Sequence, residues 1–172
     1  MKIEGTATVA TPPERAWQQI NDPSVIQRCT PGLTSLEETA PDHYDAVIEL
    51  KLPAVRGRFE GSVDFAERHP PDRLVMRLAG KGPPGFMNGD AELVLRPAGE
   101  GTEFQYAADV QVGGQIARLG QRMVSGVAKD MAGQFFAAFE RIDQLPAGQS
   151  AAPSPLVAFL QLIWRSLRRL FS

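Results

Sequence analysis

The chain has 172 residues, of which 43% are hydrophobic and 22% charged, a size that suits one globular domain with an appendage. Residues 1–144 contain 15 Lys and Arg against 20 Asp and Glu, whereas residues 145–172 contain three arginines and no acid. An acidic body argues against nucleic acid as a partner. The start has no secretory leader and the chain has one cysteine, Cys29, so we expect a cytoplasmic protein without a disulfide, in which Cys29 is buried as a small hydrophobic residue.

The first part of the chain predicts one strand, two short helices and then a run of strands. Alternating apolar and polar residues from Lys2 to Ala10 are typical of a half-buried strand. Thr11, two prolines and Glu14 have the spacing of a capping box, which predicts a helix from Pro12 to Asn21. A second short helix is expected at PSVIQRC, after Asp22. Six further strands, with connections too short for crossover helices, are expected at Leu33–Thr39, Tyr44–Leu52, Val55–Arg68, Arg73–Lys81, Gly89–Arg96 and Thr102–Val112.

A long amphipathic helix is predicted next, because apolar residues recur every three or four positions from Gly114 to Gln144. Gly120, Gly126 and Gly133 lie inside it, where each costs about 1 kcal/mol relative to alanine. We expect these glycines where the sheet or a ligand approaches closely. Together the elements predict an α+β helix-grip fold: a seven-stranded curved antiparallel sheet wrapped around a long C-terminal helix, with a cavity in the gap between them.

The end of the chain predicts a membrane-associated helix. We expect a ligand-binding domain at residues 1–145, a flexible Pro/Ala/Ser-rich linker at 146–155 and an amphipathic helix at 156–172. That helix would be about 25 Å long, shorter than the ~30 Å of membrane hydrocarbon, so it is expected to lie in the membrane interface. Packing on its own domain, or in a groove of a partner protein, stays open. The expected membrane-binding residues are Phe159, Leu160, Ile163, Trp164, Arg165, Leu167, Arg168, Arg169, Leu170 and Phe171.

Five stretches, in order, resemble the carbon monoxide dehydrogenase G-subunit family of the START/Bet v 1-like (SRPBCC) superfamily. They cover about residues 1–142 and read MKIEGTATV, W..INDPSVIQRCTPG, RGRFEGSVDF, GKG..GF..GDAEL and VGGQIARLGQRMVSGVAKDMAGQFFAAF. Pro83-Pro84 departs from the small flexible residues expected there. The resemblance implies a membrane-associated accessory protein of a carbon monoxide dehydrogenase-type molybdenum hydroxylase. Such a protein would link the enzyme to the quinone pool, at the cytoplasmic face of the cell membrane.

The apolar strand faces predict either a packed core or the wall of an adaptable pocket, to which flexible methionines would contribute. The predicted cavity, the tail and the resemblance together favour a membrane quinone such as menaquinone, or another isoprenoid or apolar ligand, with no covalent cofactor. Phe86 and Met87 are expected near the entrance, and Tyr106 is the expected inward polar group. The expected ligand-binding residues are Ile48, Leu50, Phe59, Val63, Met76, Leu78, Phe86, Met87, Phe104, Tyr106, Leu119, Met123, Val127 and Met131.

Catalytic chemistry finds little support in the sequence. His43 and His69 lie beside turns without a metal-ligand partner at i+3 or i+4, and we expect exposed loop residues at both positions. Glu60 and Asp64 share a strand face with arginines, which favours a solvated outer face with ion pairs over an acid–base pair. The leading hypothesis is a non-catalytic carrier that recruits the dehydrogenase to the membrane. A recruitment adaptor without a ligand, or a polyketide cyclase-like enzyme, stays open.

Overall fold

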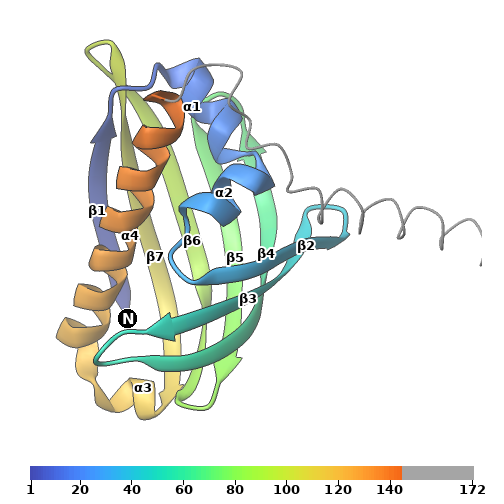
Figure 1. The fold of residues 1–172 in the computed structure, drawn as a ribbon, viewed down its shortest axis with the longest axis vertical. Coiled ribbons are helices and arrows are strands. Elements are labelled where there is room, and N and C mark those ends of the chain that lie inside the picture. The colour runs from blue at the N-terminus through green and yellow to red at the C-terminus, as the bar shows by residue number, and fades with distance from the viewer. Residues whose placement is uncertain (145–172) are drawn as a thin grey trace, which may run out of the picture. The chain divides into compact units, whose positions relative to one another are not determined.

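A computed structural model describes residues 1–144; the linker and the membrane-interface helix predicted for residues 146–172 lie outside this part of the chain. The described residues form a seven-stranded antiparallel sheet that curves around a C-terminal helix (Figure 1), which confirms the predicted α+β helix-grip architecture. The elements in chain order are β1 (Lys2–Val9), α1 (Pro13–Ile20), α2 (Pro23–Cys29), β2 (Leu33–Ala40), β3 (His43–Lys51), β4 (Arg56–His69), β5 (Arg73–Gly82), β6 (Gly85–Ala98), β7 (Gly101–Gly114), α3 (Gln115–Arg118) and α4 (Gly120–Gln144).

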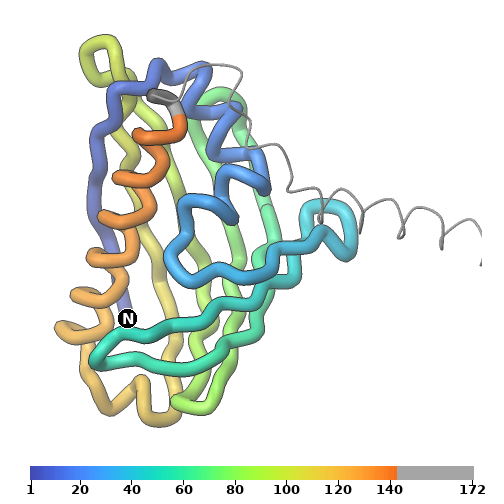
Figure 2. The backbone as a smooth tube through the Cα atoms, in the orientation of Figure 1, coloured from blue at the N-terminus to red at the C-terminus, as the bar shows by residue number. Residues whose placement is uncertain are grey.

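The strand order β1-β7-β6-β5-β4-β3-β2 brings the first and last strands of the chain together. The other strands follow one another as hairpins, which is why short turns suffice. Figure 2 shows the long strands bending along their length, with α1 and α2 over one end of the curved face. Hydrogen bonds join both halves of α4 to β1 and to the residue that follows it. Gln121 donates to the carbonyl of Lys2 (2.6 Å), and Glu140 accepts from the backbone N–H of Ala10 (3.1 Å).

The strand β6 begins earlier than expected, at Gly85 instead of Gly89. Pro83 and Pro84 form the two central positions of a tight hairpin, because Gly82 already pairs with Gly85. Neither proline has an N–H to donate, so both suit a turn where no ladder bond is made. Pairing therefore resumes directly after the turn, and the segment expected as a loop is part of the strand.

The C-terminal helical region is interrupted and does not form the single helix predicted from Gly114. The short helix α3 ends at Arg118, and α4 begins at Gly120, whose φ of 79° lies in the left-handed region that favours glycine. The expectation that the sheet approaches Gly120, Gly126 and Gly133 closely was wrong, since no atom of the protein lies within 4 Å of a Cβ built at any of them; a close ligand there stays a prediction. Backbone conformation explains why residue 120 is a glycine, whereas packing against the rest of the protein explains none of the three.

The predicted capping box at Thr11 does not form. Helix α1 begins at Pro13 without a side-chain cap, and the buried Thr11 hydroxyl has no hydrogen-bond partner among the described residues. The Thr11 carbonyl instead accepts from the Thr102 hydroxyl at 2.7 Å, which ties the start of α1 to β7. Helix α2 has the cap that α1 lacks, because the Asp22 carboxylate accepts from the backbone N–H of Ser24 at 2.9 Å.

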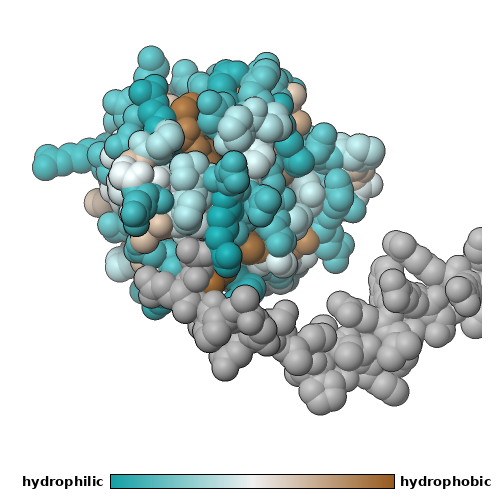
Figure 3. Space-filling model, turned by 90° about the horizontal axis from the view of Figure 1, so that it is seen from above, coloured by the Kyte–Doolittle hydropathy of each residue, from teal (hydrophilic) through white to brown (hydrophobic). Residues whose placement is uncertain are grey.

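Two buried clusters fill the space between sheet and helix. The larger includes residues of α1, α2 and the C-terminal half of α4: Val9, Ala16, Ile20, Val25, Cys29, Leu74, Leu93, Leu95, Phe104, Phe136 and Phe139. The smaller includes residues of α3 and the N-terminal half of α4: Ile3, Val55, Phe59, Val110, Ile116 and Val124. Cys29 is buried as expected, and its burial raises the pKa of the thiol. The face in Figure 3 is mostly hydrophilic, with hydrophobic side chains in small separate spots among the coloured residues.

Candidate functional site

An apolar cavity of about 410 Å³ lies between the sheet, the two short helices and the C-terminal half of α4. Its volume falls within the range of small-molecule binding sites, about 300–1,000 Å³. Every strand except β1 contributes to its wall. The lining residues are Ile20, Asn21, Pro23, Ile26, Leu36, Tyr44, Val63, Phe65, Leu74, Met76, Leu78, Leu93, Tyr106, Ala132, Phe135 and Phe136.

Regular periodicity of strand and helix brings these side chains to one wall. Leu74, Met76 and Leu78 alternate along β5, so all three point to the same face of the sheet. Helix α4 contributes Ala132, Phe135 and Phe136, which follow the i, i+3, i+4 spacing of one helix face. The small Ala132 side chain leaves room on the helix side, where a larger residue would enter the cavity.

The polar side chains of the wall are few: among the described lining residues they are Asn21, Tyr44 and Tyr106. The Tyr106 hydroxyl lies over Gly5 of β1, where an added Cβ would collide with it. The ring of Tyr106 stacks on that of Phe136, with centroids 6.3 Å apart. Tyr106 therefore lines the cavity, as expected of an inward polar residue, while its hydroxyl lies close to the first strand.

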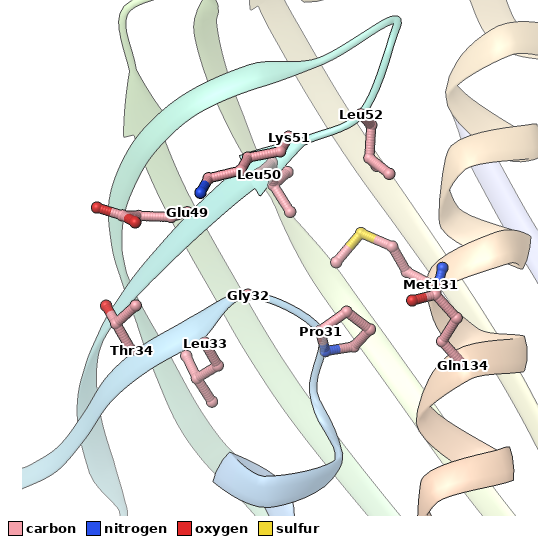
Figure 4. A pocket seen from close by; sticks show the side chains of 10 residues that line it. All are labelled: Pro31, Gly32, Leu33, Thr34, Glu49, Leu50, Lys51, Leu52, Met131 and Gln134. Atoms are coloured by element: carbon pink, nitrogen blue, oxygen red, sulfur yellow. The ribbon is translucent and has the colours of Figure 1, made fainter.

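A second hollow, of about 400 Å³, lies between β3, the turn after α2 and helix α4 (Figure 4). The side chain of Met131 extends from α4 toward Leu50 and Leu52, while Glu49 points away from the hollow. The turn is held in place by Gly32, whose φ is 77° and whose carbonyl accepts from the N–H of Glu49 at 2.8 Å. A side chain at position 32 would collide with the carbonyl of Glu49, so this close approach requires glycine.

A third hollow, of about 600 Å³, lies where the turn between β3 and β4 faces Leu119 and the N-terminal half of α4. Its apolar residues include Leu119 and Met123, and Met123 is 49% exposed. Arg122 and Asp130 make its rim charged. This hollow is wider and more polar than the cavity beneath α1 and α2.

The structure does not bring all the predicted ligand-binding residues together. Four line the main cavity: Val63, Met76, Leu78 and Tyr106. Two line the hollow of Figure 4, Leu50 and Met131, and three line the third hollow, Leu119, Met123 and Val127. Three more belong to packed regions: Phe104 is buried in the larger cluster, Phe59 in the smaller, and Ile48 packs against the smaller. The ligand-binding role of these residues stays a prediction.

Phe86 and Met87 are not placed beside the cavity. They are 44% and 36% exposed and line none of the three hollows. The Phe86 ring lies over Gly113 of β7, because the two-residue turn at Pro83-Pro84 puts Phe86 into the strand pair. Their expected position near an entrance therefore does not agree with the structure.

Sequence reasoning missed the contributions of the short helices and of the C-terminal half of α4. Ile20, Asn21 and Ile26 line the cavity from α1 and α2. The residues predicted to face the cavity, Leu119 to Met131, lie nearer the N-terminal end of the helical region than the observed lining residues, Ala132 to Phe136. The phenylalanines of the sequence FFAAF lie close together, and they could have indicated that this part of α4 faces the cavity.

His69 is exposed as expected, with a side chain that is 55% accessible, whereas His43 differs from the expected exposed loop residue. His43 begins β3 and is only 33% exposed; it contacts the carboxylates of Asp64 and Asp45. The hydrogen bond to Asp64 is the main reason why the pKa of His43 is raised. His69 is the last residue of β4 and lies 2.8 Å from a Glu67 oxygen. Among residues 1–144, no three His, Cys, Asp or Glu side chains form a group that could hold a metal ion.

A curved antiparallel sheet that grips a C-terminal helix over an apolar cavity defines a helix-grip protein. Solved structures share this fold. A conserved protein from Geobacillus kaustophilus is 31% identical, with a TM-score of 0.79 over 82% of this chain and 93% of that chain. A START superfamily protein from Mycobacterium smegmatis, 18% identical, has a TM-score of 0.61 over 83% of this chain and 97% of that chain.

The family follows from the sequence match. The family model of the carbon monoxide dehydrogenase G subunit (CoxG) matches residues 5–142, and the chain belongs to this family. A search of curated proteins gives no match. Within residues 1–144, no helix is long and apolar enough to cross a membrane.

Proposed function

We propose that the chain is a non-catalytic accessory protein that carries an apolar ligand, a membrane quinone such as menaquinone, for a carbon monoxide dehydrogenase-type enzyme. The observation that carries this proposal is the apolar cavity of about 410 Å³ between the sheet and α4. Membership of the CoxG family supports the choice of enzyme. The START-like fold supports a small hydrophobic ligand.

The energetics of burial favour a flat, ring-shaped ligand in this cavity. A ring system that buries about 150–250 Å² of apolar surface gains roughly 4–6 kcal/mol at about 25 cal/mol per Å². Immobilising the ligand takes back part of that gain. The rings of Phe135 and Phe136 at the helix wall offer edge and face contacts to such a ligand.

The side chains that line the cavity suit a carrier protein that does not catalyse a reaction on its ligand. An enzyme acting on a bound polyketide would need acid–base groups directed at its substrate. Among the described residues that line the cavity, the polar side chains are an amide and two phenols, Asn21, Tyr44 and Tyr106. His43 and His69 do not line it and are engaged with carboxylates. This set favours a carrier over a cyclase.

The membrane association is proposed from the sequence beyond residue 144. Five or six large apolar side chains partly buried in an interface would gain about 5–9 kcal/mol, and each arginine near anionic lipid adds about 1 kcal/mol. The three arginines of residues 145–172 suit the anionic cytoplasmic leaflet. There the protein would reach both a quinone dissolved in the membrane and an enzyme at its cytoplasmic face.

The experiment that tests the proposal identifies the ligand directly. The full chain is purified without detergent from cells that contain quinone, extracted with organic solvent and analysed by mass spectrometry. We expect quinone at close to one molecule per chain. A cavity that is empty after purification and takes up no added quinone would contradict carriage and leave a recruitment adaptor.

A further inference from the structure

Three segments of the chain meet at the end of the sheet that lies opposite α1: the β3–β4 turn, the β5–β6 turn and helix α3 (Figure 1). The N–H of Ile116 donates to the carbonyl of Pro84 at 3.1 Å, which joins α3 to the β5–β6 turn. The ring of Pro83 lies 3.6 Å from where a Cβ would stand at Gly57, so the same turn also lies against the start of β4. We call this end the basic pole and define it by residues 49–60, 79–89 and 110–123.

Positive charge is concentrated at the basic pole. Its segments contain six Lys and Arg against two Asp and Glu, whereas the rest of residues 1–144 contains nine Lys and Arg against 18 Asp and Glu. All six cations are exposed: Lys51, Arg56, Arg58, Lys81, Arg118 and Arg122. The body is therefore acidic overall but has a positive surface at one end.

Most cations of the basic pole are not neutralised by a carboxylate. Arg58 contacts Glu60 at 3.6 Å, and no ion pair within residues 1–144 involves the other five. Three arginines of β4 and β5 that lie away from the pole are paired: Arg68 with Asp42 (3.1 Å), Arg73 with Glu92 (2.7 Å) and Arg77 with Asp90 (3.4 Å). The unpaired charge at the pole is available to attract an anionic surface.

Apolar side chains are exposed at the same pole. The most exposed large hydrophobic residues in the described part of the chain are Phe86, Met87 and Met123, at 44%, 36% and 49%, and all three belong to the pole. Phe86 lies directly opposite the unpaired Lys81 in the ladder of β5 and β6. Met123 instead lines the third hollow, which does not include Phe86. Exposed apolar side chains at a positively charged surface are typical of an interaction site.

The combination favours an anionic lipid surface as the partner. Unpaired Lys and Arg can contact lipid phosphates, while single apolar side chains enter the boundary between headgroups and acyl chains. A protein interface instead buries a continuous apolar core in which charged residues are depleted. The pole offers Phe86 and Met123 separately among six cations, which suits fluid lipids that can surround single side chains.

We propose that the basic pole is a membrane-docking surface of the folded body, at which Phe86 and Met123 enter an anionic lipid interface and the cations contact phosphate groups. This contact is separate from the one proposed for residues 156–172 and rests on no property of that segment. It does not depend on the proposed ligand either, because it requires only the surface of residues 1–144. The third hollow, which Met123 lines, would then face the lipid.

The first test measures co-sedimentation of the full chain with vesicles of phosphatidylcholine, with and without phosphatidylglycerol. The pole variant carries Lys51→Gln, Lys81→Gln, Arg118→Gln and Arg122→Gln. Each cation near an anionic surface contributes up to about fivefold to binding, and salt screens part of this. We therefore expect the pole variant to bind the anionic vesicles at least about tenfold more weakly than the wild type.

A matched control removes the same net charge from exposed positions away from the pole. It carries Arg28→Gln, Arg77→Gln, Arg96→Gln and Lys129→Gln. We expect its affinity for the anionic vesicles to fall by less than about threefold, since charges beyond a Debye length of the lipid are screened. Equal losses in the pole variant and the control would show that only net charge matters, and would overturn the inference.

The second test reports directly which end of the body reaches the lipid. An environment-sensitive nitrobenzoxadiazole label is attached to the full chain at Phe86→Cys or, in the turn between β6 and β7 at the other end of the sheet, at Glu100→Cys. Cys29 is buried, so it stays unlabelled in the folded protein. We expect anionic vesicles to raise the emission and shift it to the blue at position 86 and not at position 100.

These results separate docking by the pole from anchoring by residues 156–172. A folded pole variant with wild-type affinity for anionic vesicles, or equal emission changes at positions 86 and 100, would overturn the inference. The label at position 86 decides the question if the pole variant does not fold. Extraction of quinone tests the proposed carriage separately, so either proposal can fail while the other holds.

Discussion

Phenylalanine side chains in this protein occupy three different environments. Phe139 and Phe104 are fully buried, and their ring centroids lie 5.5 Å apart. Phe135 lines the cavity, and Phe86 on β6 is 44% exposed. The same substitution therefore has a different cost at each position, which distinguishes packing from ligand contact.

Truncation of Phe139 should destabilise the fold strongly. Phe139→Ala removes a ring that contacts Phe104, Phe135 and Phe136, and we expect the free energy of unfolding to fall by about 3–5 kcal/mol. Phe86→Ala is the matched control and should cost at most about 1 kcal/mol. Urea unfolding measures both free energies. Equal losses in the two variants would contradict the assignment of Phe139 to the core.

His43 should make stability depend on pH. The hydrogen bond to Asp64 raises the pKa of His43 above its ordinary value of 6.5. The protonated ring therefore stabilises the fold fully below that value, and the contribution is lost as pH rises through the raised pKa. The melting temperature of the wild type relative to that of His43→Gln should fall as the pH rises above about 6.5. A difference in melting temperature that does not change with pH would show that the His43–Asp64 pair does not contribute to stability.

In helix α4, backbone conformation and packing place different requirements on the glycines. Its first residue, Gly120, has a positive φ, whereas Gly126 lies within the helix with open space around it. Both glycines have the same sequence signature, yet only Gly120 is required by the backbone. The start of α4 therefore requires glycine because of its backbone conformation, whereas a side chain is tolerated at Gly126 in the middle of the helix.

Alanine at these two glycines should have opposite effects. Gly126→Ala is expected to raise the free energy of unfolding by about 0.5–1 kcal/mol, because alanine is the better helix former and meets no neighbour. Gly120→Ala should lower it by about 1–2 kcal/mol, since a Cβ is unfavourable in the left-handed region. Chemical denaturation measures both; a stabilising change at Gly120 would contradict the break between α3 and α4.

For the whole molecule, patterns within single elements could be predicted from the sequence, and contacts between elements could not. Alternation was enough to place Val63, Met76 and Leu78 on the inner face of the sheet. Which turn of α4 faces the cavity depends on how the helix lies along the sheet, so the wall residue Ala132 was missed. Glycine in a helical pattern does not show its φ, so the break at Gly120 was missed as well.

The central claim, that the space between sheet and α4 binds an apolar ligand, is tested most directly by filling that space. Ala132 lines the cavity and Ala137, on the same helix, is exposed, so Ala132→Trp and Ala137→Trp make the same change at two positions.

The measurement is a calorimetric titration of a short-chain naphthoquinone into the full-length wild type and both variants, with thermal unfolding to confirm that each is folded. We expect the wild type and Ala137→Trp to bind with similar affinity, and Ala132→Trp to bind at least about tenfold more weakly, because the indole occupies the ligand's volume. Equal affinity in all three folded proteins would contradict binding in this cavity.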